Sequence, residues 1–279
     1  MASGEERDEI RTVARAFEYE RYLAALLMPR NVREPLVLLA AFSAELRRVP
    51  SLVTEPMMGS IRLQWWRDAL DAAAGGGDVV RSGNPLADAL AVTVRRHDLP
   101  WGLLQGMIDA AEYALDPTPF QHTAETRQYL IKREAALFEL SGRVAGARPP
   151  REVWANAGLA YGAFRCAVAY DAARRHGAQT FLSREVAEPA ADETGEGRRW
   201  FAERAAEALG PVRAAAKTLG RPARRVLLPL AIIEPFLRRS SSAAERPFGG
   251  RPVVGSGIVE PSRLARATRL LLRHWRGGF

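Results

Sequence analysis

The sequence predicts a single-domain, all-α protein. Apolar residues recur with helical spacing along most of the 279 residues, and neither a hairpin signal nor an alternating β pattern stands out. The stretches rich in glycine and proline show no change in composition on either side, so none reads as an interdomain linker. We therefore expect one domain over residues 1–279, with residues 1–8 forming a disordered N-terminus.

The expected helices follow from apolar spacing and from residues that begin or end helices. Pro29 should end the first helix, and Pro35 suits the first turn of the second because a proline there loses no hydrogen bond. Gly75, Gly76 and Gly77 should end the third. The helices are expected over 9–27, from Pro35 onward, and over 58–74, 85–97, 102–115, 124–145, 153–175, 198–219, 221–239 and 261–275, with loops at 75–83, 186–197 and 240–257.

Composition indicates the partners and the compartment. The 40 basic residues exceed the 32 acidic ones by eight, which favours anionic partners such as diphosphates or acidic lipid headgroups. No nucleic-acid recognition motif accompanies this charge, so we expect no nucleic-acid partner. The single Cys166 suits a reducing compartment, and the acidic N-terminus does not resemble a signal peptide. We expect a cytoplasmic protein, with room for peripheral contact at the inner membrane face.

Motifs for known chemistries are largely missing. The sequence contains no P-loop, no Gly-x-Ser-x-Gly elbow and no His-Glu-x-x-His pair. Carboxylate pairs at helical spacing, such as Glu112 and Asp116, could share a hard cation. A helical chain with 32 acidic residues produces such pairs by chance, however, so we assign neither catalytic residues nor metal ligands.

Several segments resemble a known family. YLAALLMP at 22–29, LVLLAAF at 36–42 and SIRLQWWRDAL at 60–70 are similar, in order and spacing, to the opening of squalene and phytoene synthases. GLAYGAFRCAVAYDAARRHGAQTFL at 158–182 is similar to the second motif region of that family, and VLLPLAIIEPFLRR at 226–239 to its C-terminal helices. The resemblance covers nearly the whole chain and implies a helical bundle of the type I isoprenoid synthase class.

The aspartate motifs of the family are degenerate in this sequence. Where the synthases carry Asp-Asp-x-x-Asp, which binds Mg²⁺ and the substrate diphosphate, residues 47–51 read Arg-Arg-Val-Pro-Ser. Pro50 lacks the amide that would bond to the carbonyl of Leu46, at a cost of ~3 kcal/mol inside a helix, so we expect the helix to end or kink there. In the second motif only Asp171 remains, flanked by Arg174 and Arg175, which favours an ion pair over a metal ligand.

A non-canonical branch of the family resembles the chain more specifically. That branch includes the mitochondrial complex I assembly factor with a phytoene-synthase-like domain. It combines Ala-Phe-x-x-Glu-Leu, here residues 41–46, with a Gln-aromatic-Trp run, here 64–66. The resemblance implies a non-condensing protein that supports respiratory complex I assembly through a protein partner, or that binds an isoprenoid.

Two other functions remain open. The alternative is an active prenyl-diphosphate transferase of the head-to-head type, acting on allylic diphosphates; only this interpretation calls for a cofactor, Mg²⁺. A third is a pocket that holds an isoprenoid, a diphosphate or a quinone lipid without turnover, since Gly162 and neighbouring alanines leave space on one helix. The residues expected around an anion-binding pocket are Tyr22, Arg47, Arg48, Arg62, Gln64, Arg67, Asp171, Arg174 and Arg175.

Overall fold

The computed structural model describes residues 4–74, 82–187, 195–244 and 262–279, and helices make up most of these segments. No β-strand occurs in the described ranges, where one isolated bridge joins Phe120 to Ser183. The all-α prediction is therefore confirmed. The N-terminal half holds α1 (Gly4–Phe17), α2 (Tyr19–Leu26), α3 (Arg30–Leu52), α4 (Pro56–Ala74), α5 (Pro85–His97), α6 (Trp101–Glu112) and α7 (Thr123–Leu130).

The second half begins with a change of helical type. α7 continues into a π-turn, η1 (Ile131–Ala135), and then into α8 (Ala136–Val144) without a break. A 3₁₀ segment, η2 (Leu228–Ile232), links two later helices. The remaining helices are α9 (Arg151–Arg175), α10 (Arg184–Ala187), α11 (Glu196–Ala216), α12 (Arg221–Val226), α13 (Ile233–Ala244) and α14 (Arg263–Trp275).

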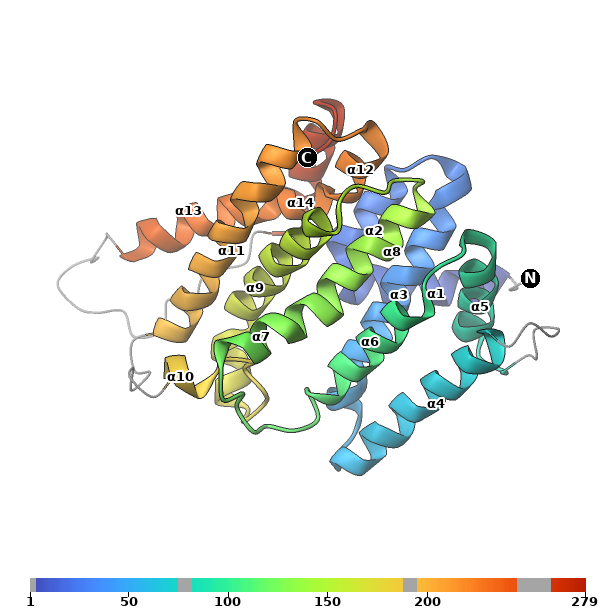
Figure 1. Ribbon diagram of the computed structural model, residues 1–279, viewed down its shortest axis with the longest axis horizontal. Coiled ribbons are helices and arrows are strands. Elements are labelled where there is room, and N and C mark those ends of the chain that lie inside the picture. Colours follow the sequence, from blue (N-terminus) through green and yellow to red (C-terminus); the bar gives the residue numbers. More distant parts are fainter. Residues whose placement is uncertain (1–3, 75–81, 188–194, 245–261) are drawn as a thin grey trace.

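The helices surround α3 and α9, the two longest in the described chain. α9 packs along α11 and against η1, whereas α3 packs against α1, α2, α5 and α8. Figure 1 shows α4 and α5 on the side of the bundle opposite α11 and α13. Fully buried Phe42 on α3, Tyr161 on α9 and Phe236 on α13 belong to one hydrophobic cluster. Among the described helices, none is both long and apolar enough to cross a membrane.

Local sequence signals explain the best-predicted helix. α5 covers the expected residues 85–97, and Asn84 caps it by accepting hydrogen bonds from the amides of Leu86 and Ala87 at 3.0 and 3.1 Å. Pro85 occupies the first helical position, where it loses no hydrogen bond. The adjacent tryptophans of α4 divide as helical geometry requires, because Trp66 is buried and Trp65 is exposed.

The expected first helix, 9–27, is instead two helices. α1 ends at Phe17, and Glu18 adopts φ −130° and ψ 49° before α2 begins. The amide of Tyr22 still bonds to the carbonyl of Glu18 at 2.8 Å, so the chain turns sharply without losing its helical start. This turn directs the carboxylate of Glu18 into the bundle, where the side chain is fully buried.

α3 differs from the prediction at both ends. It begins at Arg30 instead of near Pro35, because the amides of Val32 and Arg33 bond to the carbonyl of Pro29 at 3.1 Å. It also runs past Pro50 to Leu52, so the expectation that the helix ends within residues 47–51 is wrong. The carbonyl of Leu46 still lacks the amide that Pro50 cannot supply, but α3 continues for only two residues beyond the proline.

Two further segments differ from expectation. α1 begins at Gly4, so residues 4–8 are helical where a disordered terminus was expected, and residues 1–3 lie outside the described chain. α13 extends to Ala244 and so includes 240–244, the start of the expected 240–257 loop. The rest of that loop, and most of the glycine-rich 75–83, lie outside the described residues.

Candidate functional site

A cavity of about 250 Å³, which we call the central cavity, lies between the C-terminal turns of α3, the α7–η1 region and α9. Its volume is just below the range of roughly 300–1,000 Å³ typical of ligand pockets. The wall is mostly apolar and rich in small side chains, with charged groups concentrated at α3, η1 and α9. The lining residues are Arg47, Pro50, Ala114, Tyr129, Leu130, Arg133, Glu134, Gly162, Arg165, Cys166, Ala169, Tyr170, Ala173, Ala178, Gln179, Thr180 and Phe181.

The two degenerate motif regions meet at this cavity. Arg47 and Pro50 come from the first, and the α9 residues beside Asp171 come from the second. Arg48 turns away from the cavity: it pairs with Glu45 at 2.7 Å and stacks over the ring of Phe17 at 4.5 Å. Because α3 stays helical through residues 47–51, Arg47 reaches the cavity from the former aspartate position.

Glu18 anchors the charged side of the cavity. Its Oε2 accepts hydrogen bonds from Nη1 of Arg165 at 2.9 Å and of Arg21 at 3.4 Å, and its Oε1 accepts one from the Ser43 hydroxyl at 3.0 Å. Burial opposes ionisation of Glu18, but the two guanidinium groups and the hydroxyl outweigh it and lower the pKa of the carboxyl. Glu18 is therefore ionised at neutral pH.

Arg47 also approaches Glu18, but it is paired less completely than Arg21 and Arg165. Its Nη1 lies 3.4 Å from Oε1 of Glu18, near enough for an ion pair, but it makes no hydrogen bond within the protein. The same oxygen of Glu18 already accepts from Ser43. Arg47 thus lines the cavity while its buried Nη1 lacks a hydrogen-bond partner, and an anion that reached its guanidinium group would be stabilised.

Glu134 is the one carboxylate among the lining residues, and arginines already hold it. Its Oε2 accepts from Nη1 of Arg21 at 2.7 Å, and its Oε1 lies 3.6 Å from Nε of Arg133. Arg133 also donates to the hydroxyl of Tyr129. Burial acts against the charge of Arg21, but Glu134 and Glu18 outweigh it and raise the pKa of its guanidinium.

Cations outnumber anions around the cavity. Four guanidinium groups, from Arg21, Arg47, Arg133 and Arg165, face two carboxylates, from Glu18 and Glu134, which leaves an excess of two positive charges. Placing charges away from water is costly unless they are paired. An anionic group that enters the cavity would supply the missing counter-charge.

The potentially reactive groups of the cavity are held in their neutral forms. Burial raises the pKa of the Cys166 thiol to about 12, so the nucleophilic thiolate is scarce at neutral pH. Burial also raises the pKa of the Tyr129 hydroxyl, despite the nearby Arg133. These side chains suit the wall of a binding cavity better than nucleophilic or general-base catalysis.

The donor set does not fit Mg²⁺, which prefers several carboxylate oxygens and water in an octahedral arrangement. Glu134 is engaged by two arginines, and Asp171 accepts from Nη1 of Arg198 at 2.6 Å. Across the described ranges, no three side chains of His, Cys, Asp or Glu converge on one point. Asp171 is thus ion-paired as expected, although its partner is Arg198 and the expected partners were Arg174 and Arg175.

The other sequence candidates lie elsewhere. Tyr22 packs against the hydrophobic core, and Arg62 is exposed on α4. Gln64 donates to Asp68 at 2.7 Å, while Arg67 bridges Asp109 and Glu112, each at 2.9 Å. Arg174 and Arg175 are exposed at the end of α9. Of the nine predicted pocket residues, Arg47 is the one that lines the cavity.

Sequence reasoning missed Arg21, Arg133, Glu134 and Arg165. Only Arg21 gave a signal: it directly precedes the YLAALLMP segment, at a place where the resemblance to the synthases implies Ser-Phe and this sequence has Glu20-Arg21. The structure shows that both residues of this dipeptide are buried and paired: Glu20 accepts from Arg266 at 2.6 Å and from Tyr161 at 3.2 Å. The Glu20-Arg21 dipeptide therefore introduces ion pairs inside the bundle.

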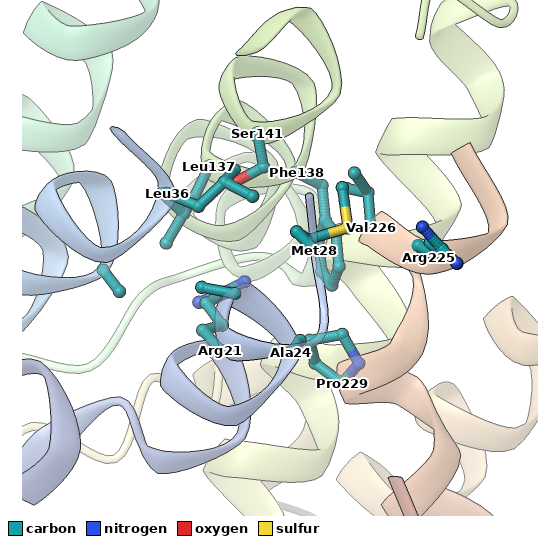
Figure 2. Close-up of a pocket in the computed structure, with 12 residues that line it drawn as sticks. Arg21, Ala24, Met28, Leu36, Leu137, Phe138, Ser141, Arg225, Val226 and Pro229 are labelled. Atoms are coloured by element: carbon teal, nitrogen blue, oxygen red, sulfur yellow. The ribbon is translucent and has the colours of Figure 1, made fainter. Parts of the chain in front are cut away.

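A second, much smaller cavity lies on another side of Arg21 (Figure 2). Its volume of about 30 Å³ is enough for one water molecule. Met28, Leu36, Phe138 and Val226 make most of its wall apolar, and Arg21 and Ser141 are polar exceptions (Figure 2). Arg21 thus lines this small pocket and also donates to Glu134, which lines the larger cavity.

Comparison with known proteins agrees with the all-α fold. A model of the squalene/phytoene synthase family matches residues 14–257. Two crystal structures share the fold: squalene synthase HpnC from Alicyclobacillus acidocaldarius, with a TM-score of 0.72 and 16% identity over 88% of this chain and 96% of its own, and a dehydrosqualene synthase in complex with a ligand, with a TM-score of 0.72 and 13% identity over 98% and 97%.

Curated relatives carry a different description. They are named NADH dehydrogenase (ubiquinone) complex I, assembly factor 6. The rat protein is 31% identical over 61% of this chain and 50% of its own length, the bovine protein 30% over 46% and 38%, and the human protein 29% over 46% and 38%. The chain thus matches half or less of the length of these relatives.

Proposed function

The chain belongs to the squalene/phytoene synthase family, and we propose that it is a non-condensing member that supports the assembly of respiratory complex I. The observation that carries this proposal is Arg47, an arginine that lines the central cavity from the former aspartate position. The aspartates that would hold a metal-bound diphosphate are absent at this position, and the guanidinium group of Arg47 supplies positive charge directly.

The electrostatics of the cavity support a binding role. The ionisation of an allylic diphosphate in the synthases needs cations that stabilise the departing pyrophosphate. Here the arginines are already paired with Glu18 and Glu134, and the excess of two charges favours one bound anion. Guanidinium groups bind phosphate and carboxylate oxygens well without a metal.

The apolar wall indicates the rest of the ligand. Small side chains at Ala114, Gly162, Ala169 and Ala173 leave space beside the charged groups, and Phe181 adds an aromatic surface. This combination suits an amphipathic molecule with an anionic head and a hydrocarbon chain. We propose an isoprenoid, in particular an isoprenoid diphosphate, as the ligand, with a quinone-type lipid as the neutral counterpart.

The assembly role is inferred from relatives named for it. Their names describe assembly factors of complex I, and this chain shares about 30% identity with part of each. We propose that a protein of that assembly process is the partner. Because complex I is a membrane complex, we also propose that the chain acts on the cytoplasmic side of the membrane as a peripheral protein.

The alternative, an active prenyl-diphosphate transferase, has weaker support. The additional arginines that could have replaced metal ions are occupied, because Arg48 pairs with Glu45 and Arg67 pairs with Asp109 and Glu112. Neither side chain lines the cavity. The positive charge that remains is sufficient for binding but lacks the acidic ligands that hold catalytic Mg²⁺.

A product assay tests the non-condensing role. The purified protein is incubated with farnesyl or geranylgeranyl diphosphate and Mg²⁺, and both pyrophosphate release and lipid products are measured. We expect neither a head-to-head product nor pyrophosphate above the level without protein. Clear turnover would establish the alternative.

A genetic experiment tests the assembly role. Deletion of the gene in its source organism should lower the amount of assembled complex I on native gels. A copy with Arg62→Ala should restore assembly, because Arg62 is exposed on α4, and a copy with Arg47→Ala should restore it less well. Normal complex I in the deletion strain would contradict the assembly role.

A further inference from the structure

The C-terminal helix α14 directs charged side chains toward the bundle and apolar side chains toward solvent. Two of its arginines bond to groups of the bundle: Arg266 donates to Glu20 at 2.6 Å, and Arg269 donates to the carbonyl of Ala231 at 2.9 Å. Arg269 and Arg273 also lie within 3.6 Å of one carboxylate, that of Glu234. Leu270 is the one buried residue that α14 contributes to the core. The inner face of this helix is therefore held mainly by ion pairs.

The outer face is apolar and exposed. Leu264 and Trp275 are 77% and 79% exposed, and Leu271 and Leu272 are 42% and 46% exposed. Residues 264, 268, 271 and 275 recur at the spacing of one helical face, so three of these side chains and Thr268 form a continuous stripe with Leu272 at its border. Large apolar side chains in such a row indicate a surface that another phase or molecule covers.

Exposed arginines lie at both ends of this stripe. Of the five arginines in 262–279, Arg263 and Arg276 are exposed, whereas the other three pair with Glu20 and Glu234; the segment contains neither aspartate nor glutamate, and α12 adds three more arginines. The two segments are in contact, since the amide of Phe279 bonds to the carbonyl of Arg224 at 3.2 Å. Beside them, a hollow of about 270 Å³ is lined by Arg213, Lys217, Arg224 and Arg273, with Ala216 and Phe279. Figure 1 shows the C-terminus next to α12.

We propose that the outer face of α14 docks on an anionic lipid bilayer. Leucine and tryptophan side chains along one helix face enter the boundary between headgroups and acyl chains, and flanking arginines contact lipid phosphates. Charge complementarity selects a membrane over a second copy of this chain, because a second copy would bring the same basic surface. This inference deepens the peripheral placement proposed above.

The apolar patch on α4 provides a matched comparison. Met57, Met58 and Ile61 are 72%, 52% and 56% exposed, so its apolar surface is similar in extent. α4, however, also carries Asp68 and Asp71, and its single exposed cation is Arg62. Substitutions on α4 therefore remove apolar area without altering the basic surface around α14.

Vesicle sedimentation tests the proposal with the full chain. We expect the native protein to sediment with vesicles of phosphatidylcholine and phosphatidylglycerol and to stay in solution with phosphatidylcholine alone. Leu264→Ser with Trp275→Ser should weaken binding by at least about a hundredfold, since each of the two large apolar side chains contributes about a factor of ten or more. Met57→Ser with Ile61→Ser should leave binding unchanged. The substituted side chains are exposed, and circular dichroism verifies the fold.

Three results would overturn the proposal: a native protein that binds no anionic vesicles, an α14 variant that binds them normally, or an α4 variant that loses binding equally. A native dimer that the α14 substitutions convert to a monomer, without vesicle binding, would assign the stripe to a second copy. None of these results bears on condensation, which the product assay measures separately.

Discussion

Arg165 on α9 and Glu18 at the start of α2 form a hydrogen-bonded ion pair at 2.9 Å, although 147 residues separate them in the sequence. Glu18 is fully buried, and Arg21 and Ser43 bind the same carboxylate. This pair joins the N-terminal helices to the wall of the central cavity. One carboxylate, that of Glu18, therefore pairs with several guanidinium groups, and the proposed anionic ligand would interact with the same guanidinium groups.

Loss of the Glu18 charge should destabilise the protein strongly. Glu18→Gln leaves half-buried Arg165 without its counter-ion and buried Arg21 with Glu134 alone, and breaking a buried pair in this way costs about 3–5 kcal/mol. The free energy of unfolding in urea measures the effect. Glu45→Gln is the matched control, because its pair with Arg48 lies near the surface and should contribute less than about 1 kcal/mol. Equal losses in the two variants would contradict the buried network.

Stability should fall in acid because of the same group. The pKa of Glu18 lies below its ordinary value of 4.5 in the folded protein, so its contribution is fully present above that value. As the pH falls below 4.5, the unfolded chain takes up a proton on this carboxylate before the folded protein does, so the stabilising contribution decreases. It is lost once the pH has fallen through the folded-state pKa. Urea unfolding measured between neutral pH and the acid range should show this loss, and Glu18→Gln should show less of it. Parallel profiles would refute the assignment.

Gly158 should tolerate no side chain. A Cβ at this position of α9 would lie 2.3 Å from the backbone nitrogen of Ala135, the last residue of η1, and backbone cannot move aside as a side-chain tip can. We expect Gly158→Ala to lower stability by about 3 kcal/mol, as overpacking does. Gly102→Ala is the control: nothing lies within 4 Å of its Cβ, and the change should stabilise α6 by about 0.5 kcal/mol. Thermal unfolding distinguishes these outcomes.

Cys166 should react slowly with alkylating reagents. With its pKa raised to about 12, the thiolate fraction at mild alkaline pH is about a thousandfold below that of an unperturbed thiol. Iodoacetamide labelling followed by mass spectrometry measures the rate, and the urea-unfolded chain gives the reference. A ligand in the cavity should slow labelling further, because Cys166 lines that cavity. Rapid labelling of the folded protein would show that this part of the wall is open to water.

Local signals explain how far sequence reasoning reached. The 85–97 helix could be placed because Asn84 and Pro85 fix its start chemically. The break at Glu18 and the π-turn at 131–135 could not, because both depend on tertiary contacts that no local pattern encodes. Residues 47–51 illustrate the same limit: the loss of acidic residues is visible in the sequence, but the persistence of α3 past Pro50 is not.

The candidate site was predictable only where one residue stood in a recognisable motif. Arg47 could be found in this way. Arg165 and Glu134 could not, because Arg165 pairs with Glu18 across 147 residues and Glu134 pairs with Arg21 across 113. In a chain with 38 arginines beside two lysines, no single arginine marks a site until its partners are known.

Calorimetric titration with a non-hydrolysable farnesyl diphosphate analogue tests the central claim most directly. The native protein should bind the analogue equally well with Mg²⁺ and with a chelator, because arginines supply the charge. Arg47→Ala should weaken binding by about 10- to 100-fold, the value of a lost charged hydrogen bond, while exposed Arg62→Ala should not. Binding that requires Mg²⁺ and ignores Arg47 would contradict the account.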